Sequence, residues 1–301
     1  MGTAPETMPY PGYVLERLNR LSLTRSFTPQ VDVDWRQITT EDEFRELYPA
    51  WSLLAGTGAD ARLDERGRAA FARYQQANLM MFTGMLERYA VIGLAGAYEL
   101  DPSEEFSEYV GHFMKEEIYH TMMFRRAMER LHAGLPAGLP HLPTSGLKRL
   151  LKIIFGVVNA MPSRKLRATL TFRILRFVEQ VTIYANQMAQ SRIARRESLV
   201  RQIWSYHALD EGRHLVFDAM ILERNRLPKW LDWAPRTFAV LCCMALSLLL
   251  NAQEIWMGRQ LGLKLVYWQL PGLMRRTQAP FKQRAFGLVA RALKGETEVG
   301  E

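Results

Sequence analysis

One pattern occurs twice in this chain and limits the folds open to it. A glutamate stands inside an apolar run, and 30 or 32 residues later a Glu-x-x-His motif follows. Residues three apart leave the same face of a helix, and an interval of about 30 residues lets a chain run up one helix, turn and return to a similar height on its partner. The residues are Glu87 with Glu117 and His120, and Glu179 with Glu211 and His214.

The two glutamates in apolar runs indicate a buried cation. "GMLERYAV" surrounds Glu87, and "RFVEQVTIY" surrounds Glu179. An ionised carboxylate taken out of water without a partner is strongly disfavoured, so a cation or a hydrogen-bond network is expected there. Two glutamates and two Glu-x-x-His pairs supply four carboxylates and two imidazoles. This set suits two iron or manganese ions, whereas a single zinc ion needs fewer ligands.

Helical periodicity dominates the sequence, and we find no convincing strand pattern. Residues 1–35 are predicted to form an irregular arm. Thr40 and Glu43 form a capping-box pattern that begins a helix, and Asp101 is expected to cap a later one. Long helices are predicted at about 64–100, 103–132, 163–193 and 198–226, with a shorter one near 147–158. Between them, "HAGLPAGLPHLPTSG" at residues 132–146 excludes a continuous helix and predicts a long crossover.

This order of segments predicts an all-α fold. Two helical hairpins joined by a long crossover are typical of a four-helix bundle, which builds metal sites from inward-facing carboxylates and histidines. We expect one domain over 1–301. It comprises a di-metal core at 64–226, an N-terminal arm and helix at 1–63, and a C-terminal helical extension at 227–301.

An acidic residue precedes each motif glutamate. It is Glu116 in the first hairpin and Asp210 in the second. Metal-bound histidines usually donate their free N–H to such a carboxylate. We therefore predict that Asp210 orients His120 and that Glu116 orients His214, each across the bundle.

The stretch "HALDEGRH" adds a third residue to the second motif. His207, Glu211 and His214 stand at offsets of 0, 4 and 7, which fall within an arc of about 60° on one helix. Three potential metal ligands therefore converge from a single helix.

With these residues in place, the sequence resembles the di-iron carboxylate oxygenases of the ferritin-like superfamily. Within them it is similar to the para-aminobenzoate N-oxygenase (AurF-like) family, over residues 64–226. That family carries an extra histidine one turn before the second motif glutamate, where His207 stands. The resemblance implies a ferritin-like bundle and seven metal ligands: Glu87, Glu117, His120, Glu179, His207, Glu211 and His214.

The resemblance also implies the chemistry. Two iron ions would activate O2, the co-substrate, through a peroxo-bridged diferric intermediate. An aryl amine would then be oxidised through hydroxylamine and nitroso stages to a nitro compound. Electrons would come from an external donor, because the sequence has no Gly-x-Gly-x-x-Gly fingerprint for a nicotinamide or flavin cofactor. No catalytic residue is expected beyond the metal cluster.

Residues that line a substrate pocket can be predicted only from helical offsets. Side chains on the same helix face as Glu87 or Glu179 are candidates. They are Thr83, Val91, Phe172, Leu175, Thr182 and Ile183.

Charge and cysteine content narrow the setting of the protein. Lysine and arginine exceed aspartate and glutamate by 39 to 31, a surplus that suits an acidic partner, an anionic membrane surface or an anionic substrate. Cys242 and Cys243 are adjacent and give no disulfide framework, and the N-terminus has no secretory pattern. We therefore expect a cytoplasmic protein. Dispersed basic residues argue against nucleic-acid binding.

A 13-residue uncharged run, "FAVLCCMALSLLL", occupies residues 238–250. It is shorter than the roughly 20 residues that a membrane-spanning helix needs, so a buried helix is predicted rather than a membrane contact.

Two other functions use the same fold. A di-iron hydroxylase or desaturase acting on an acyl or aminoacyl substrate would use the same ligands, and a basic surface could dock its acidic carrier protein. A ferritin-like iron oxidation or storage protein needs little more than half of this chain. The sequence is compatible with a homodimer and does not test it.

Overall fold

A computed structural model describes residues 12–25, 27–135 and 144–294. Helices and three short 3₁₀ turns make up the regular structure of these residues, which contain no strand, so the all-α prediction is confirmed. The helices are α1 (Gly12–Arg25), α2 (Pro29–Asp32), α3 (Glu41–Trp51), α4 (Glu65–Ala95), α5 (Glu104–Ala133), α6 (Ser145–Asn159), α7 (Arg164–Arg192), α8 (Leu199–Arg224), α9 (Lys229–Gln260), α10 (Leu270–Arg276) and α11 (Pro280–Lys294).

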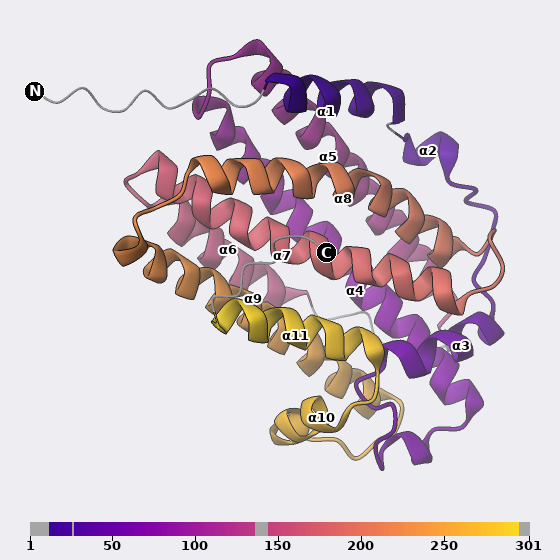
Figure 1. The fold of residues 1–301 in the computed structure, drawn as a ribbon. Helices are drawn as coiled ribbons and strands as arrows, with labels where there is room; N and C mark the ends of the chain where they lie inside the picture. The colour runs from indigo at the N-terminus through magenta and orange to yellow at the C-terminus, as the bar shows by residue number, and fades with distance from the viewer. Residues whose placement is uncertain (1–11, 26, 136–143, 295–301) are drawn as a thin grey trace, which may run out of the picture.

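Two helix pairs form the centre of the molecule (Figure 1). Helix α4 packs most extensively against α5, and α7 packs against α8. Contacts of α4 with α7, and of α5 with α8, join the two pairs into a ferritin-like four-helix bundle. The bounds of these four helices lie close to the predicted ones. The predicted crossover falls partly outside the described residues, at 136–143.

Local sequence signals explain one helix start and mislead at another. The side chain of Thr40 accepts a hydrogen bond from the backbone N–H of Glu43, whose carboxylate accepts one from the backbone of Thr40 at 2.6 Å, so the predicted capping box is confirmed. Asp101 does not occupy the capping position of α5, which belongs to Ser103. Its carboxylate instead accepts a hydrogen bond from the backbone N–H of Ser103 and pairs with Arg224.

The N-terminal prediction was wrong for the residues that the structure describes. Two helices, α1 and α2, lie where an irregular arm was expected, and α1 packs along α5. Leu15 and Leu18 are buried on one face of α1. Tyr13 and Leu23 on this helix are exposed, so its apolar residues do not form one clear stripe. The helix is therefore easily overlooked in a segment rich in proline and polar residues. After α1, the ring of Phe27 stacks near that of His120, with centroids 5.8 Å apart.

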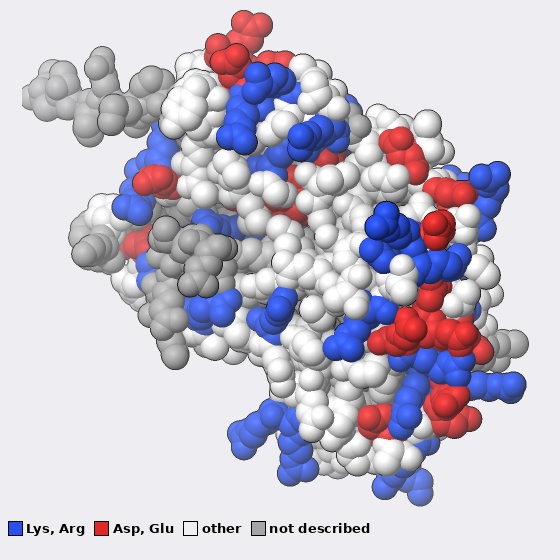
Figure 2. Space-filling model, turned by 45° about the vertical axis from the view of Figure 1, so that its right-hand side comes forward, with Lys and Arg blue, Asp and Glu red and all other residues white. Residues whose placement is uncertain are grey.

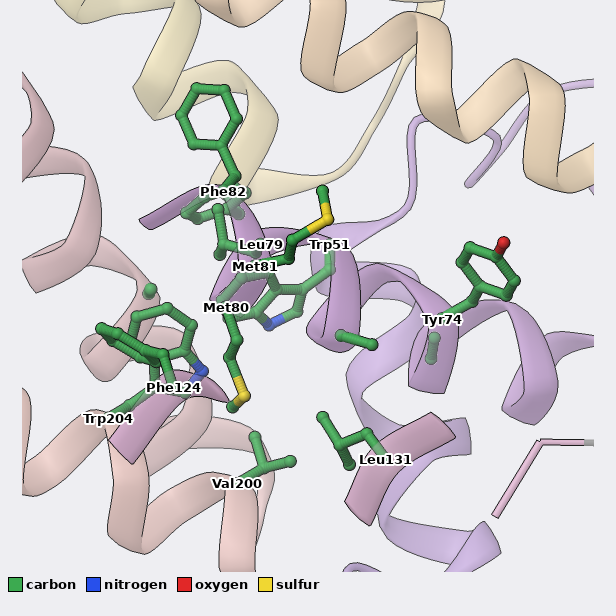
Figure 3. Close-up of a cluster of buried hydrophobic side chains, with 14 of the residues drawn as sticks. Trp51, Tyr74, Leu79, Met80, Met81, Phe82, Phe124, Leu131, Val200 and Trp204 are labelled. Carbon is green, nitrogen blue, oxygen red and sulfur yellow. The ribbon is translucent and has the colours of Figure 1, made fainter. Parts of the chain in front are cut away.

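Two apolar clusters flank the middle of the bundle. Figure 3 shows part of the larger one, in which Met80 of α4 lies near Phe124 and Trp204. The indole N–H of Trp204 donates to Gln76 at 2.9 Å, which satisfies a polar group in the core. The smaller cluster gathers aromatic side chains of α5, α7 and α8. The candidate site lies between the two clusters.

Helices α9 and α11 cover one side of the bundle. Helix α9 packs against α7 and α4, and α11 contacts α9, α7 and α3. The apolar helix is longer than the 13-residue run predicted. The stretch Asp232–Gln260 of α9 is, by length and composition alone, long and apolar enough to cross a membrane. In this fold 56% of its most apolar window is buried, and the helical core of a soluble protein meets the same test. Cys242 and Cys243 are both buried there.

Candidate metal centre

All seven predicted ligands point into the interior of the bundle. Each of the four central helices contributes at least one of them, and no side chain in the set belongs to a residue more than 5% exposed. The four-helix arrangement therefore brings groups from distant parts of the chain into one buried site. They are Glu87 on α4, Glu117 and His120 on α5, Glu179 on α7, and His207, Glu211 and His214 on α8.

The ligand atoms form two groups that share one carboxylate. Glu87, His120, His207 and Glu211 each offer an atom within 4.8 Å of the others, and the same holds for Glu117, Glu211 and His214. Because Glu211 belongs to both groups, its carboxylate lies where it could bridge two ions. Two adjacent sites of this kind match the dinuclear arrangement that four-helix bundles support.

Individual distances show how closely the first group converges. Nε2 of His207 lies 2.7 Å from Oε1 of Glu87 and 3.1 Å from Oε1 of Glu211. Nδ1 of His120 lies 3.6 Å from the same oxygen of Glu211. These atoms surround a space the size of a metal site, since a bound ion would stand about 2 Å from each nitrogen.

The second group contains one imidazole and two carboxylates. Nδ1 of His214 lies 3.3 Å from Oε1 of Glu117 and 3.5 Å from Oε1 of Glu211. Phe113 stacks on the His214 ring, with centroids 3.6 Å apart. This apolar face restricts the orientation of the histidine and keeps water from that side.

Glu179 stands apart from both groups but faces the same space. It lines the pocket that Glu87, Glu117 and Glu211 also line, and neither of its oxygens has a hydrogen-bond partner among the described residues. Asp218, one turn after His214 on α8, is buried close to it and contributes to its raised pKa. The sequence analysis did not identify Asp218, although its position four residues after a ligand histidine was a usable signal.

The donor atoms fit a cationic group. Buried polar atoms normally have hydrogen-bond partners, yet every one of the seven residues presents at least one buried atom without one among the described residues. Four carboxylates would balance two divalent cations. Six of the residues contribute Glu87 Oε2, Glu117 Oε2, His120 Nδ1, both oxygens of Glu179, Glu211 Oε2 and His214 Nδ1. The seventh contributes His207 Nδ1, whereas the nitrogen of His207 that faces the first group is Nε2.

Burial and the crowding of like charges shift the pKa values of the residues in this site. Burial, followed by the neighbouring carboxylates, raises the pKa of Glu87 and of Glu179 well above the ordinary value. Burial, with the nearby imidazoles, lowers the pKa of His207. Burial alone would lower the pKa of His214 too, but its hydrogen bonds to acidic groups outweigh burial and raise it. Metal ions would relieve the repulsion among the carboxylates.

Acidic residues lie behind two of the histidines, His120 and His214. Nε2 of His120 lies 3.0 Å from Oδ2 of Asp210, and Nε2 of His214 lies 2.9 Å from Oε2 of Glu116. These are the two contacts across the bundle that the sequence predicted. With each Nε2 as the donor, each Nδ1 turns its lone pair toward the cluster.

Arg213 joins these two acids. Its Nη2 donates to Oε1 of Glu116 at 2.7 Å and also to Asp210. The three side chains therefore form one buried network behind both histidines. Hydrogen bonds to the Arg213 guanidinium and to His214 outweigh burial and hold the pKa of Glu116 well below its usual range. Arg213 was visible in the motif "DEGRH", but the sequence analysis gave it no role.

Two pockets meet beside the cluster. One of about 250 Å³ is lined by ligand residues together with Leu175 and Thr182, and one of about 550 Å³ is lined in part by Thr83 and Thr182. Three of the predicted pocket residues line neither. Phe172 packs in the smaller apolar cluster, and Val91 and Ile183 are half-buried elsewhere on their helices.

The fold and site define a class of protein, namely helical bundles that hold metal ions with carboxylates and histidines. Comparison with known families shows to which family of this class the chain belongs. The chain matches the family described as P-aminobenzoate N-oxygenase AurF over residues 12–257, and it belongs to that family. The match extends well beyond residues 64–226, so the family region includes α1 to α3 and most of α9.

Similar curated proteins come from mycobacteria. Two uncharacterised proteins, one from Mycobacterium bovis and one from Mycobacterium tuberculosis, are each 25% identical over 243 residues, which cover 76% of this chain and 67% of theirs. Another uncharacterised protein of M. tuberculosis is 25% identical over 222 residues, covering 72% of this chain and 61% of its own. The family thus implies an oxygenase with a di-iron centre, while these relatives name no substrate.

Proposed function

We propose that this protein is a di-iron oxygenase that uses O2 to oxidise an aryl amine to a hydroxylamine, nitroso or nitro product. One observation carries the proposal: two groups of buried carboxylates and imidazoles converge, and Glu211 belongs to both. Family membership supplies the class of reaction.

The ligand set favours iron, with manganese as the alternative. Mixed carboxylate and imidazole donors suit both ions, whereas a structural zinc site usually has four ligands. Bound iron would supply O2 activation, which no side chain in this site provides by itself.

The residues of the chain hold and orient that centre. Asp210 and Glu116 keep the Nε2 protons of His120 and His214, and Arg213 fixes both acids. Aromatic and aliphatic side chains from both apolar clusters surround the site and limit the entry of water. A water-poor cavity also strengthens the electrostatic interactions within it.

The first oxidation step requires electrons from outside the protein. Conversion of an amine and O2 to a hydroxylamine and water consumes two electrons and two protons, so a reduced partner protein or a small reductant must take part. An external donor is therefore part of the proposal.

Turnover by iron-loaded protein tests the proposal. We expect O2 uptake with a chemical reductant to increase on addition of an aryl amine, and the absorbance of a nitro or nitroso product to appear. The Glu87→Ala and His120→Ala variants should lose this activity, whereas His112→Ala should keep it, because His112 lies on α5 outside the cluster. Iron oxidation without any dependence on an amine would instead support ferritin-like chemistry.

One feature favours a carrier-bound substrate as the second candidate. Residues 255–295 contain eight lysines and arginines and no acidic residue. One of the eight, Lys282, is buried and paired with Glu254, which leaves seven for a partner. On the face in Figure 2, acidic and basic side chains mix on the right, while basic ones project alone at the lower left. Such a segment suits an acidic carrier protein, as a hydroxylase or desaturase would need. Turnover of carrier-loaded but not free substrate would favour this candidate.

A further inference from the structure

The larger pocket leads from the C-terminal helices to the metal centre. Side chains of α4, α7, α9 and α11 line it. Val178 and Thr182 line both this pocket and the smaller one at the cluster. A molecule in the larger pocket would therefore lie next to the metal ligands.

The wall of this pocket is mainly apolar. Leucine, valine and phenylalanine side chains dominate it, among them Leu79, Phe82, Leu250 and Phe286. Such a wall favours a flat, apolar ligand, because burial of apolar surface is the main contribution to binding in a pocket of this kind.

The cation in the wall is already neutralised. Among the described residues that line the larger pocket, Lys282 is the only charged one, and its ammonium group pairs with Glu254. Glu254 also accepts hydrogen bonds from the side chain of Gln75 at 2.7 Å and from the backbone N–H of Leu53 at 3.0 Å. Both charges of the pair are buried, so the wall offers no net positive charge to a carboxylate.

One polar atom in the wall lacks a partner. Asn251 lines the pocket and is 2% exposed. Its side-chain nitrogen donates to the backbone carbonyl of Ser247 at 2.7 Å, while its oxygen has no partner among the described residues. Asn251 lies on α9, which contributes nothing to the wall of the smaller pocket. This oxygen can accept a hydrogen bond from the end of a ligand that faces away from the cluster.

We infer that the larger pocket binds an uncharged aromatic amine whose far end carries a hydrogen-bond donor for Asn251, and that it rejects carboxylated analogues such as p-aminobenzoate. This inference rests on the proposed function for the role of the ligand as substrate. The ligand class itself follows from the wall. A carboxylate there would meet a neutral ion pair, an amide oxygen and the hydroxyl groups of Thr83, Thr182 and Ser247. None of these carries the positive charge that would compensate for the lost hydration of the anion.

A matched pair of ligands tests the inference directly. 4-Aminobenzamide and 4-aminobenzoate have nearly the same shape and the same amino group. At the opposite end the first is neutral and has N–H donors, whereas the second is an anion with acceptors only. Isothermal titration of metal-free wild-type protein should show the amide binding at least about tenfold more tightly, because a buried carboxylate without a counter-charge is disfavoured. Equal or tighter binding of the carboxylate, or no binding of either, would overturn the inference.

Two charge variants identify the cause of the preference. Glu254→Gln leaves the ammonium of Lys282 without a counter-charge, so it should shift the preference toward the carboxylate. The double variant Glu254→Gln/Lys282→Met is neutral again and should restore preference for the amide. An unchanged preference in Glu254→Gln, with the fold verified by circular dichroism, would contradict the role of the pair. If Glu254→Gln does not fold, the comparison of the two ligands on wild-type protein still tests the inference.

Two tryptophan variants locate the binding site. Leu250→Trp fills the pocket and should abolish binding, whereas Leu248→Trp, on an exposed part of the same helix, should not. Binding that survives Leu250→Trp would place the ligand elsewhere and overturn the inference. Because these titrations need neither metal nor turnover, their failure is distinct from a failure of the proposed oxygenation.

Discussion

Nε2 of His207 lies 2.7 Å from Oε1 of Glu87, although 120 positions separate the two residues in the chain. Glu87 belongs to the first helix pair and His207 to the second. The contact therefore forms only when the two pairs pack together. Metal binding at this site should accordingly be coupled to folding of the whole bundle.

Replacement of His207 tests its role as the additional ligand. The His207→Ala variant should lower the iron content from two ions toward one per chain, because the group around Glu87 loses an imidazole. Iron bound per folded chain can be measured by mass spectrometry after desalting. His112→Ala is the matched control on α5 and should retain full iron content. Full iron loading and normal turnover in His207→Ala would show that His207 is not a metal ligand.

Asp210→Asn tests the orientation of His120. The amide keeps the size of the side chain but removes the negative charge from the hydrogen bond at 3.0 Å. We expect metal affinity to fall by about 10- to 100-fold, as is typical when such an outer carboxylate is changed. Competition titration with a metal-binding dye measures this. An unchanged affinity would show that Asp210 does not support the ligand histidine.

Arg213→Leu tests the network that joins Glu116 and Asp210. Removal of the guanidinium leaves two buried carboxylates without their cation, so the metal-free protein should lose about 3–5 kcal/mol of unfolding free energy. Urea denaturation followed by circular dichroism gives the value. Arg125→Leu, which breaks an exposed pair with Glu129, should have little effect. Equal losses in both variants would contradict a special role for Arg213.

Stability of the metal-free protein should depend on pH in a defined direction. Burial and like charge raise the pKa of Glu87 and Glu179 in the folded state. As pH rises, these protons therefore leave the unfolded chain at a lower pH than the folded one. Hydrogen bonds to acidic groups raise the pKa of His214, which acts in the same sense. The pKa of His207 is lowered, and its opposing effect is confined to pH values below about 6.5.

The melting temperature of metal-free protein should therefore fall as pH rises from about 6.5 to 8.5. Bound metal should largely remove this dependence, because ligation requires the deprotonated carboxylates. Differential scanning fluorimetry across this range, with and without iron(II), measures both trends. Stability of the metal-free form that rises with pH would show that the carboxylates are not crowded as described.

Much of the fold, and the buried cluster of carboxylates and histidines, could be predicted from the sequence. The four central helices followed from helical periodicity and from breaks at proline and glycine. Glu87 and Glu179 were identifiable because an acidic residue in an apolar run needs a physical reason. Asp210 could be paired with His120 before the structure was known, because metal-bound histidines have a recurrent need for a hydrogen-bond acceptor.

Other features depend on tertiary packing that the sequence does not encode locally. Helix α1 was missed because only two buried leucines mark its inner face. Glu254 and Lys282 lie on α9 and α11, and their pairing follows from how those helices pack. Helical offsets placed Phe172 and Thr182 on the same face as Glu179, but neighbouring helices decide which side chain lines a pocket and which lies in the core.

The most direct measurement is X-ray anomalous scattering at the iron edge from crystals grown with iron(II). We expect two peaks per chain. One should lie among Glu87, His120, His207 and Glu211, and the other among Glu117, Glu211 and His214. A single peak, or metal bound away from Glu211, would contradict a carboxylate-bridged dinuclear centre.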